Sequence, residues 1–363
     1  MDWKYGLTIP LFLSLAYNLP VDVEASQPSP RFLLAGQLRR DFIVLPSGEM
    51  QWDVPGGNLL YAAAGLAVWE PSPPPGLVAR VGDDYPAEWL STFARKGFDA
   101  RGVRVLSHPV DLRSFIAYSE QSIRLDADPV AFFTQRGLPF PKILLNYPTR
   151  SASPDSRSRL SPSSIRQVDL PAPYMEATAA HICPVDYLTH SLLPAVLRQA
   201  GFTLVTLDPA EGYMNPSFRE DVPSLVTGLN AFLPSEGKLR MLFLGRSDDL
   251  WEMAEIIASY GCEMVVIKRG ERGQLLYDAI TRTRWEIPAY PTKLVDPTGA
   301  GDAFCGGFQA GFTRTFDPLL ATLHGNISAS MVIEGSGPYY SLDALPGLAQ
   351  ARLDSLRHSI RKV

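Results

Sequence analysis

A glycine-rich run in the last third of the chain has the residue types best suited to chemistry. The run "LVDPTGAGDAFCGGF", residues 294–308, starts with β-favouring residues, passes through a turn and continues with apolar residues at roughly helical spacing. It therefore predicts a strand that leads through a glycine turn into a helix. The first N–H groups of such a helix lack partners within it and carry partial positive charge, so we expect an anion-binding site there.

Asp302 follows this turn directly. Gly299, Ala300 and Gly301 have little or no side chain, so a ligand can approach their backbone amides. An aspartate in a first helical turn also stabilises any helix, and the aspartate alone is equally compatible with a structural role. The conjunction is more specific, because amides that hold a phosphoryl group beside a carboxylate that accepts a hydroxyl proton suit phosphoryl transfer. The run therefore favours a kinase.

The composition is that of a globular protein that binds small molecules. Its 363 residues, 46% of them hydrophobic, are enough for one large α/β domain with appendages or for two modest domains. The net charge of −5 and the lack of long runs of like charge argue against nucleic acid as a partner. Three cysteines lie far apart without a C-x-x-C pair, so neither a disulfide framework nor a zinc site is indicated.

Residues 1–30 contain an apolar stretch, "LTIPLFLSLAYNLP", that needs its own interpretation. The stretch is too short to span a bilayer, and its prolines and the lack of a clean A-x-A site argue against a signal peptide. We therefore expect an N-terminal extension that packs on the domain or on a partner subunit. We also expect a protein without a membrane partner and with a cytoplasmic location.

Alternating patterns predict the elements that must position the glycine turn. From residue 31 onwards strand, loop and helix signals repeat, and the apolar runs end in Gly, Asp or Pro. This alternation predicts a parallel sheet, which binds ligands at the carboxyl ends of its strands. Residues 120–178 break the rhythm and are expected to form an irregular, solvated insertion, with an arginine-bearing lid over phosphates as the alternative.

Several segments, in order, resemble the ribokinase (PfkB) family of carbohydrate kinases over about residues 32–348. "DPTGAGDAF" is similar to the family's C-terminal signature and is the most specific of them. The other segments are "GQLRRD" at 36–41, "PGGN", "RVGDDYPAEWL", "KGFDARGV", "VVIKRGERG" at 265–273 and "HGNISASMVIEGSGP" at 324–338.

The resemblance implies a fold, a reaction and a set of ligands. The fold is a ribokinase-like, Rossmann-like three-layer α/β/α sandwich over residues 31–350, with a small lid whose strands lie near 38–55 and 108–120, followed by a C-terminal tail over 351–363. The reaction transfers the γ-phosphoryl group of ATP to a hydroxymethyl group of a sugar, sugar acid or nucleoside. Mg²⁺ is the implied cofactor, and K⁺ is a further candidate. A homodimer through the lid, anchored by Trp52 and Tyr118, is weighed against a monomer.

The same resemblance assigns roles to individual residues. Asp302 becomes the general base, and the amides of Gly299, Ala300 and Gly301 become the anion hole. The sugar pocket, the nucleotide side and the metal sites follow by motif position. The substrate-binding set is Asp41, Gly56, Gly57, Asn58, Tyr61 and Arg39; the nucleotide-binding set is Thr298, Lys268, Gly270, Gly273 and His324; the metal set is Glu236 for Mg²⁺ and Asp296, with Gly335 and Ser336, for a monovalent cation.

The chain also departs from the family's pattern. The resemblance places Tyr61 and Arg39 where the family has pocket asparagines. Tyr61 then favours a larger or aromatic substrate, with Asn58 as a substitute for the missing asparagine as the alternative. Arg39 favours an anionic substrate, and a surface arginine without a role in binding is equally compatible with the sequence. The N-x-x-E element that orders Mg²⁺ and phosphate has Ser235 and Lys238 at its two positions, with Glu236 displaced by two residues. A catalytically weak protein that binds a sugar or nucleotide in a regulatory or structural role is therefore the alternative.

A dinucleotide-binding oxidoreductase on a similar sheet is the third hypothesis. It requires G-x-G-x-x-G directly after the first strand, with an acidic residue about twenty positions later. The segment "AGQLRRDF" lacks this pattern, so this hypothesis is the weakest of the three.

Overall fold

The computed structural model describes residues 28–125, 128–148 and 155–363, so nearly all of the expected N-terminal extension lies outside the described residues. The α-helices are α1 (Asn58–Ala67), α2 (Ala87–Arg95), α3 (Pro129–Gln135), α4 (Tyr187–Gln199), α5 (Val222–Val226), α6 (Glu236–Leu242), α7 (Leu250–Ser259), α8 (Ala300–Thr315), α9 (Pro318–Val332) and α10 (Leu348–Leu356). The strands are β1 (Phe32–Ala35), β2 (Arg39–Val44), β3 (Met50–Gly56), β4 (Gly76–Val81), β5 (Asp99–Val105), β6 (Arg113–Tyr118), β7 (Arg124–Leu125), β8 (Ala179–Ile182), β9 (Leu204–Leu207), β10 (Ala231–Phe232), β11 (Met264–Lys268), β12 (Gln274–Asp278), β13 (Thr283–Ile287) and β14 (Arg361–Lys362).

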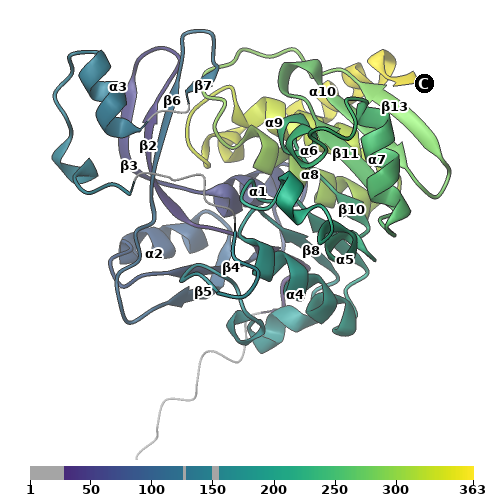
Figure 1. The fold of residues 1–363 in the computed structure, drawn as a ribbon, viewed down its shortest axis with the longest axis horizontal. Coiled ribbons are helices and arrows are strands. Elements are labelled where there is room, and N and C mark those ends of the chain that lie inside the picture. The colour runs from purple at the N-terminus through teal and green to yellow at the C-terminus, as the bar shows by residue number, and fades with distance from the viewer. Residues whose placement is uncertain (1–27, 126–127, 149–154) are drawn as a thin grey trace, which may run out of the picture.

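A sheet of ten strands forms the centre of the molecule, in the order β14-β13-β12-β11-β10-β9-β8-β1-β4-β5 (Figure 1). The strands from β11 to β5 in this order pair in parallel, whereas β12, β13 and β14 extend the sheet by antiparallel pairing. Consecutive strand residues enter opposite cores: Leu34 packs with α1, α8 and α9, and Leu33 packs with α4 and α7. The expected three-layer α/β/α sandwich is confirmed.

The order of the strands reverses at β1. The chain runs from β1 to β4 and β5 on one side and then crosses to β8 on the other side. In open α/β sheets, ligands bind beside the carboxyl ends of the strands at such a switch point. Helices α1 and α8 cross closely here, because a Cβ on Gly306 would lie 1.9 Å from the carbonyl oxygen of Ala62. The start of α8 is thereby fixed at the carboxyl edge of the sheet.

A second sheet, in the order β3-β2-β6-β7, forms a lid (Figure 1). One face, with Ile43 and Tyr118, has its own small apolar cluster, while the opposite face, with Phe42 and Phe115, is covered by α3. The dimer anchors expected in the lid are both engaged within the chain. Trp52 stacks on Phe133 of α3 with ring centroids 6.0 Å apart, and Tyr118 shares a hydrogen bond with Thr298 at 3.0 Å.

The expected limits of the domain need correction at the C-terminal end. A tail was expected over 351–363, but α10 continues to Leu356 and buries Leu353 and Leu356 in the main core. Strand β14 then pairs with β13 and lengthens the sheet. The stretch of helical periodicity in these residues is too short for the sequence alone to distinguish a packed helix from a polar tail.

The expected irregular insertion at 120–178 contains ordered parts. Helix α3 covers the lid, and Ile165 and Tyr174 are buried in the core beside β4 and β8. Within its Arg-rich part, residues 149–154 lie outside the described residues. Arg157 pairs with Asp221, the residue directly before α5, at 2.8 Å.

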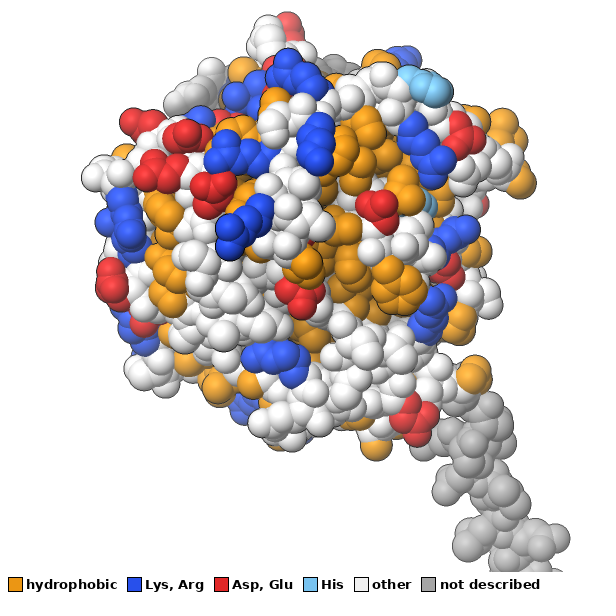
Figure 2. Space-filling model, turned by 90° about the vertical axis from the view of Figure 1, so that its right-hand side faces the viewer, with side chains coloured by type: hydrophobic (Ala, Val, Ile, Leu, Met, Phe, Trp, Pro, Cys, Tyr) orange, Lys and Arg blue, Asp and Glu red, His pale blue; other side chains and the backbone are white. Residues whose placement is uncertain are grey.

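The face at the antiparallel end of the sheet shows basic and acidic side chains interspersed (Figure 2). On β13 itself, Glu286 pairs with Arg269 at 3.1 Å and also with Arg361 of β14, and Arg284 pairs with Glu255 at 2.6 Å. Charges of both signs therefore offset one another along this edge.

Candidate active site

The first turn of α8 forms the centre of the candidate site. Gly299, directly before the helix, has φ +76°, a conformation that glycine adopts without strain. The ring of Tyr61 lies against it, and a Cβ on Gly299 would approach that ring to 2.0 Å. At Gly301, by contrast, the nearest atom to an added Cβ would be the Lys268 Nζ, at 3.5 Å. The turn is thus packed tightly against Tyr61 at Gly299, whereas Gly301 is exposed.

Asp302 lies in this first turn and is partly buried. Burial and the negative charge of Asp208 raise the pKa of its carboxyl group to about 6, although the positive charges of Lys268, Lys238 and Arg124 act in the opposite direction. A carboxylate with a pKa near neutrality is ionised at pH 7 and is still basic enough to accept a proton. The position and the pKa both suit a general base.

A second carboxylate, Asp41, lies in β2 at the base of the lid. It is buried, and it accepts a hydrogen bond from the Gly57 amide at 3.3 Å. Gly56 needs to be a glycine, because a Cβ there would lie 1.7 Å from Asp41 Oδ2. Burial raises the pKa of Asp41 to about 7, although Arg39 and the Gly57 amide lower it. Asp41, Gly56, Gly57 and Arg39 therefore lie together, and their role in binding a substrate stays a prediction.

Thr298 and Asp296 connect the lid to the glycine turn. The Thr298 amide donates to Asp296 Oδ1 at 2.9 Å, and its hydroxyl group shares the hydrogen bond with Tyr118 of the lid. Ser336 Oγ donates to Asp296 Oδ2 at 2.5 Å. The residues expected around a monovalent cation, Asp296 and Ser336, are therefore adjacent, and their role as a cation site stays a prediction.

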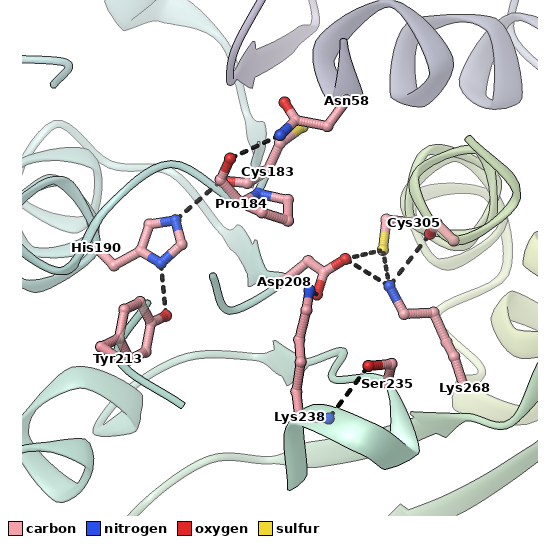
Figure 3. Close-up of polar contacts among 11 residues, drawn as sticks. Asn58, Cys183, Pro184, His190, Asp208, Tyr213, Ser235, Lys238, Lys268 and Cys305 are labelled. Atoms are coloured by element: carbon pink, nitrogen blue, oxygen red, sulfur yellow. Dashed lines mark hydrogen bonds and ion pairs between the residues drawn. The ribbon is translucent and has the colours of Figure 1, made fainter. Parts of the chain in front are cut away.

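Asn58 has a structural task at the switch point. Its Oδ1 accepts from the Gln37 amide at 2.8 Å, and its Nδ2 donates to the carbonyl oxygen of Pro184 at 2.6 Å (Figure 3). The loop after β8 is held from its other side by His190, whose Nε2 donates to the carbonyl oxygen of Cys183 at 2.9 Å. Asn58 was expected in the substrate pocket, whereas its amide joins the loops that follow β1 and β8.

An ion cluster of Asp208, Lys238 and Lys268 lies beside the glycine turn (Figure 3). Asp208 follows β9 and is buried; its Oδ1 pairs with Lys238 Nζ at 3.0 Å and its Oδ2 with Lys268 Nζ at 2.5 Å. Lys268 Nζ also donates to the carbonyl oxygen of Gly301 at 3.2 Å. Burial opposes the ionised forms, but the attraction prevails: the pKa of Asp208 is lowered and that of Lys268 is raised.

Comparison with known proteins shows which family the sequence matches. Residues 176–345 match the model of the pfkB family carbohydrate kinases. The chain carries a pfkB carbohydrate kinase domain. Enzymes of this family are phosphotransferases that use an alcohol group as acceptor, which agrees with the expected reaction class. The expected family and enzyme class are confirmed.

Individual relatives extend the match over most of the chain. The chain is 28% identical over 291 residues to a cytidine kinase of Thermococcus kodakarensis. This match covers 78% of the chain and 88% of the relative. A ribokinase-family structure from E. coli, titled as a complex with ATP and Mg²⁺, has a TM-score of 0.61 at 17% identity and covers 91% of this chain and 99% of that one. A Methanocaldococcus jannaschii nucleoside kinase has a TM-score of 0.60 at 17% identity, covering 91% and 100%.

The metal assignment of Glu236 in this pfkB domain needs correction. Its two carboxylate oxygens pair with Arg240 at 2.7 Å and with Arg272 at 2.5 Å. A carboxylate held by two guanidinium groups is not available as a Mg²⁺ ligand. Across residues 28–125, 128–148 and 155–363, no group of three or more His, Cys, Asp or Glu side chains is arranged to hold a metal ion.

The nucleotide assignment of His324 is also wrong. Its ring packs on Trp69 with centroids 4.3 Å apart, and its Nδ1 donates to the Leu320 carbonyl at 2.6 Å. A Cβ on Gly311 would approach the His324 ring to 2.7 Å, which places the ring beside the later turns of α8, about 15 Å of helix beyond Gly301. Burial lowers the pKa of His324, so the neutral ring is a core residue of the pfkB domain.

Two further residues of the expected nucleotide-binding set lie in one turn. Gly270 and Gly273 form the turn that follows Lys268, with φ +59° and +75°. A Cβ on Gly273 would lie 2.0 Å from the Ile287 carbonyl oxygen, so this turn also requires glycine for close packing. Their contact with a nucleotide stays a prediction.

Sequence reasoning missed two charged residues near the site. Asp208 ends an apolar strand in "VTLDP", and this position at the carboxyl edge of a parallel sheet is the signal that could have identified it. Arg124 of β7 is exposed on the lid, and its charge lowers the pKa values of Asp41 and Asp302.

The helices of the described ranges include none that is both long and apolar enough to cross a membrane.

Proposed function

We propose that the protein is an ATP-dependent kinase that phosphorylates a hydroxymethyl group of a nucleoside or sugar. The observation that carries the proposal is the placement of Asp302, with its pKa of about 6, in the first turn of a helix that starts at a glycine turn. Tyr61, whose ring lies against Gly299 of this turn, is also close enough to Asp41 of the lid for the charges of both aspartates to raise its pKa. The similarity to a cytidine kinase over 88% of that enzyme supports a nucleoside as the first substrate to test.

The residues around α8 fit the phosphates of ATP. The amides of Gly299, Ala300 and Gly301 belong to a helix start whose N–H groups lack partners within the helix, and Lys268 lies beside them. Because Gly301 is exposed and has no side chain, and the nearest atom to a Cβ there would be Lys268 Nζ, a phosphate can approach the backbone beside this ammonium group. These groups would hold the phosphoryl group and stabilise its negative charge during transfer.

The lid residues would hold the acceptor. Asp41 can accept hydrogen bonds from sugar hydroxyl groups, and Arg39 and Arg124 bring positive charge to the same pocket. A hydroxymethyl group directed at Asp302 would give up its proton to that carboxylate while the hydroxyl oxygen forms a bond to the γ-phosphorus of ATP. The bond from this phosphorus to the β,γ-bridging oxygen breaks, and ADP leaves. Tyr118, hydrogen-bonded to Thr298, would close the lid side of the pocket against water.

The described residues do not form a protein-bound Mg²⁺ site. Glu236 is held by two arginines, and Lys238 occupies the position of the family's metal-ordering carboxylate. Mg²⁺ supplied with ATP would neutralise phosphate charge, and no side-chain ligand for it follows from the geometry. This departure supports the second candidate function, a protein that binds a sugar or nucleotide but turns over slowly. K⁺, the homodimer and a cytoplasmic location stay predictions.

An ADP-release assay with ATP and Mg²⁺ tests the proposal across nucleosides, pentoses, hexoses and sugar acids. We expect release that depends on one substrate class and is lost in Asp302→Asn, while the exposed Asp343→Asn serves as the matched control. Nucleotide binding is measured in parallel by thermal shift. Binding without release for any acceptor would favour the second candidate function.

A further inference from the structure

Lys238 is a charged residue beside the candidate site whose role in binding or catalysis is not explained by its ion pair with Asp208. The ammonium group of a lysine has three N–H donors. Lys268 uses its donors on Asp208 Oδ2, the Gly301 carbonyl and Cys305 Sγ, at 2.5, 3.2 and 3.3 Å. Lys238 donates to Asp208 Oδ1 at 3.0 Å, and no other Lys238 Nζ contact is present among the described residues. Lys238 therefore retains donors for a ligand.

The backbone brings the two lysines together. The Lys268 amide donates to the Pro234 carbonyl at 2.9 Å, and Ser235 forms a parallel bridge with Lys268. Ser235 precedes α6, where its hydroxyl group accepts from the Lys238 amide at 3.4 Å. The Lys238 side chain is 14% exposed and that of Lys268 10%, and both ammonium groups are directed at Asp208 (Figure 3).

Among the described residues, the two ammonium groups of this cluster share Asp208 as their ion-pair partner. Two ammonium groups share one carboxylate, and a single lysine would suffice to neutralise Asp208. Asp302 is close enough for both lysines to lower its pKa, but it forms no ion pair with either within the described part of the chain. The two ammonium groups lie beside the partly positive start of α8, since Lys268 Nζ donates to the Gly301 carbonyl oxygen. This combination is electrostatically favourable once a further anion is bound.

We propose that Lys238 is a phosphate-binding residue, oriented by Asp208, that donates a hydrogen bond to the phosphates of the bound nucleotide. The proposal rests on the proposed function for the identity of the ligand as ATP. It gives the Ser235 and Lys238 departures a purpose, because a fixed ammonium group supplies positive charge at a place where the family's pattern has a carboxylate that orders metal. Lys238 is then part of the binding machinery for the triphosphate.

The test is equilibrium binding of ATP in EDTA, and of adenosine, measured by calorimetry. Lys238→Met removes the charge but keeps the length of the side chain, Lys238→Arg keeps the charge, and the exposed Lys142→Met is the matched control. We expect Lys238→Met to weaken metal-free ATP binding about tenfold or more and to leave adenosine binding within about twofold. We expect Lys238→Arg to retain most of the ATP affinity.

Two results would overturn the proposal: ATP binding that is unchanged in Lys238→Met, or ATP and adenosine binding that weaken equally. The second result would show a structural role for Lys238. The readout is separate from turnover. If the protein binds ATP in this Lys238-dependent manner but phosphorylates no acceptor, the proposed function fails and the phosphate-binding role stands. A wild-type protein that does not bind ATP would overturn both.

Discussion

The glycine turn of α8 and the Asp208 cluster lie side by side, yet they are built in different ways. The turn is made by consecutive residues, and its properties arise from backbone amides and the lack of side chains at Gly299 and Gly301. The cluster joins Asp208, Lys238 and Lys268 from three separate segments through side-chain charges. The family's pattern is kept in the first region and changed in the second. The backbone amides of the turn can therefore be kept while the side chains that supply positive charge beside them change.

The largest effect should come from the carboxylate of the turn. We expect Asp302→Asn to reduce turnover by a factor of about 10³ or more, because the proton acceptor is lost while the amides remain. Binding of ATP should change little. Steady-state kinetics with calorimetry of ATP binding checks both expectations, and a mutant with the wild-type rate would remove Asp302 from its assigned role.

In the Asp208 cluster, the effect should be on stability. We expect Asp208→Ala to lower the free energy of unfolding by about 3 kcal/mol or more, because two largely buried ammonium groups lose their counterion. Asp221→Ala, which breaks the more exposed pair with Arg157, should cost about 0 to 1 kcal/mol. Denaturant unfolding measures both values, and equal losses would contradict a special role for the cluster.

The two glycines of the turn should respond differently to the same substitution. Gly299→Ala places a Cβ against the Tyr61 ring at φ +76° and should destabilise the protein by about 3 kcal/mol. Gly301→Ala makes only an ordinary van der Waals contact with Lys268 and should change stability by less than about 1 kcal/mol, yet it should weaken ATP binding by blocking access to the amides. A stable Gly299→Ala protein would show that the turn can rearrange.

The smallest effect should be a pH dependence of stability. The pKa of Asp41 is about 7 in the folded protein, above the usual value of 3.8, so the folded state binds the extra proton between these values. Stability from this group is present at low pH and is lost as pH rises through 7. We expect Asp41→Asn to be more stable than wild type by roughly 2 kcal/mol at pH 8. The difference in stability between Asp41→Asn and wild type should be smaller at pH 4.5. Thermal unfolding at both pH values measures this difference, and a mutant less stable than wild type at pH 8 would contradict the prediction.

The sequence predicted what is local and missed what is distant. The strand, the glycine turn and Asp302 are consecutive, so residue types alone predicted their arrangement. Asp208 pairs with residues 30 and 60 positions away, and no local pattern reports such a contact. His324 was misplaced because its motif gives a position along a helix but not the helix face. Glu236 could have been predicted better, since Arg240 follows it at the i, i+4 spacing that forms ion pairs.

Helix α3 gives the lid a mechanical property. Its Phe132 and Phe133 pack edge to face, with centroids 5.4 Å apart, and both contact Phe115 in the strands beneath. A sheet of four strands with one face sealed by interlocked aromatic rings resists bending. Any displacement of the lid would therefore be a rotation about the segments that join β1 to β2, β3 to α1, β5 to β6 and the chain after α3. The angle of that rotation, rather than the shape of the lid, would set the space available to an acceptor.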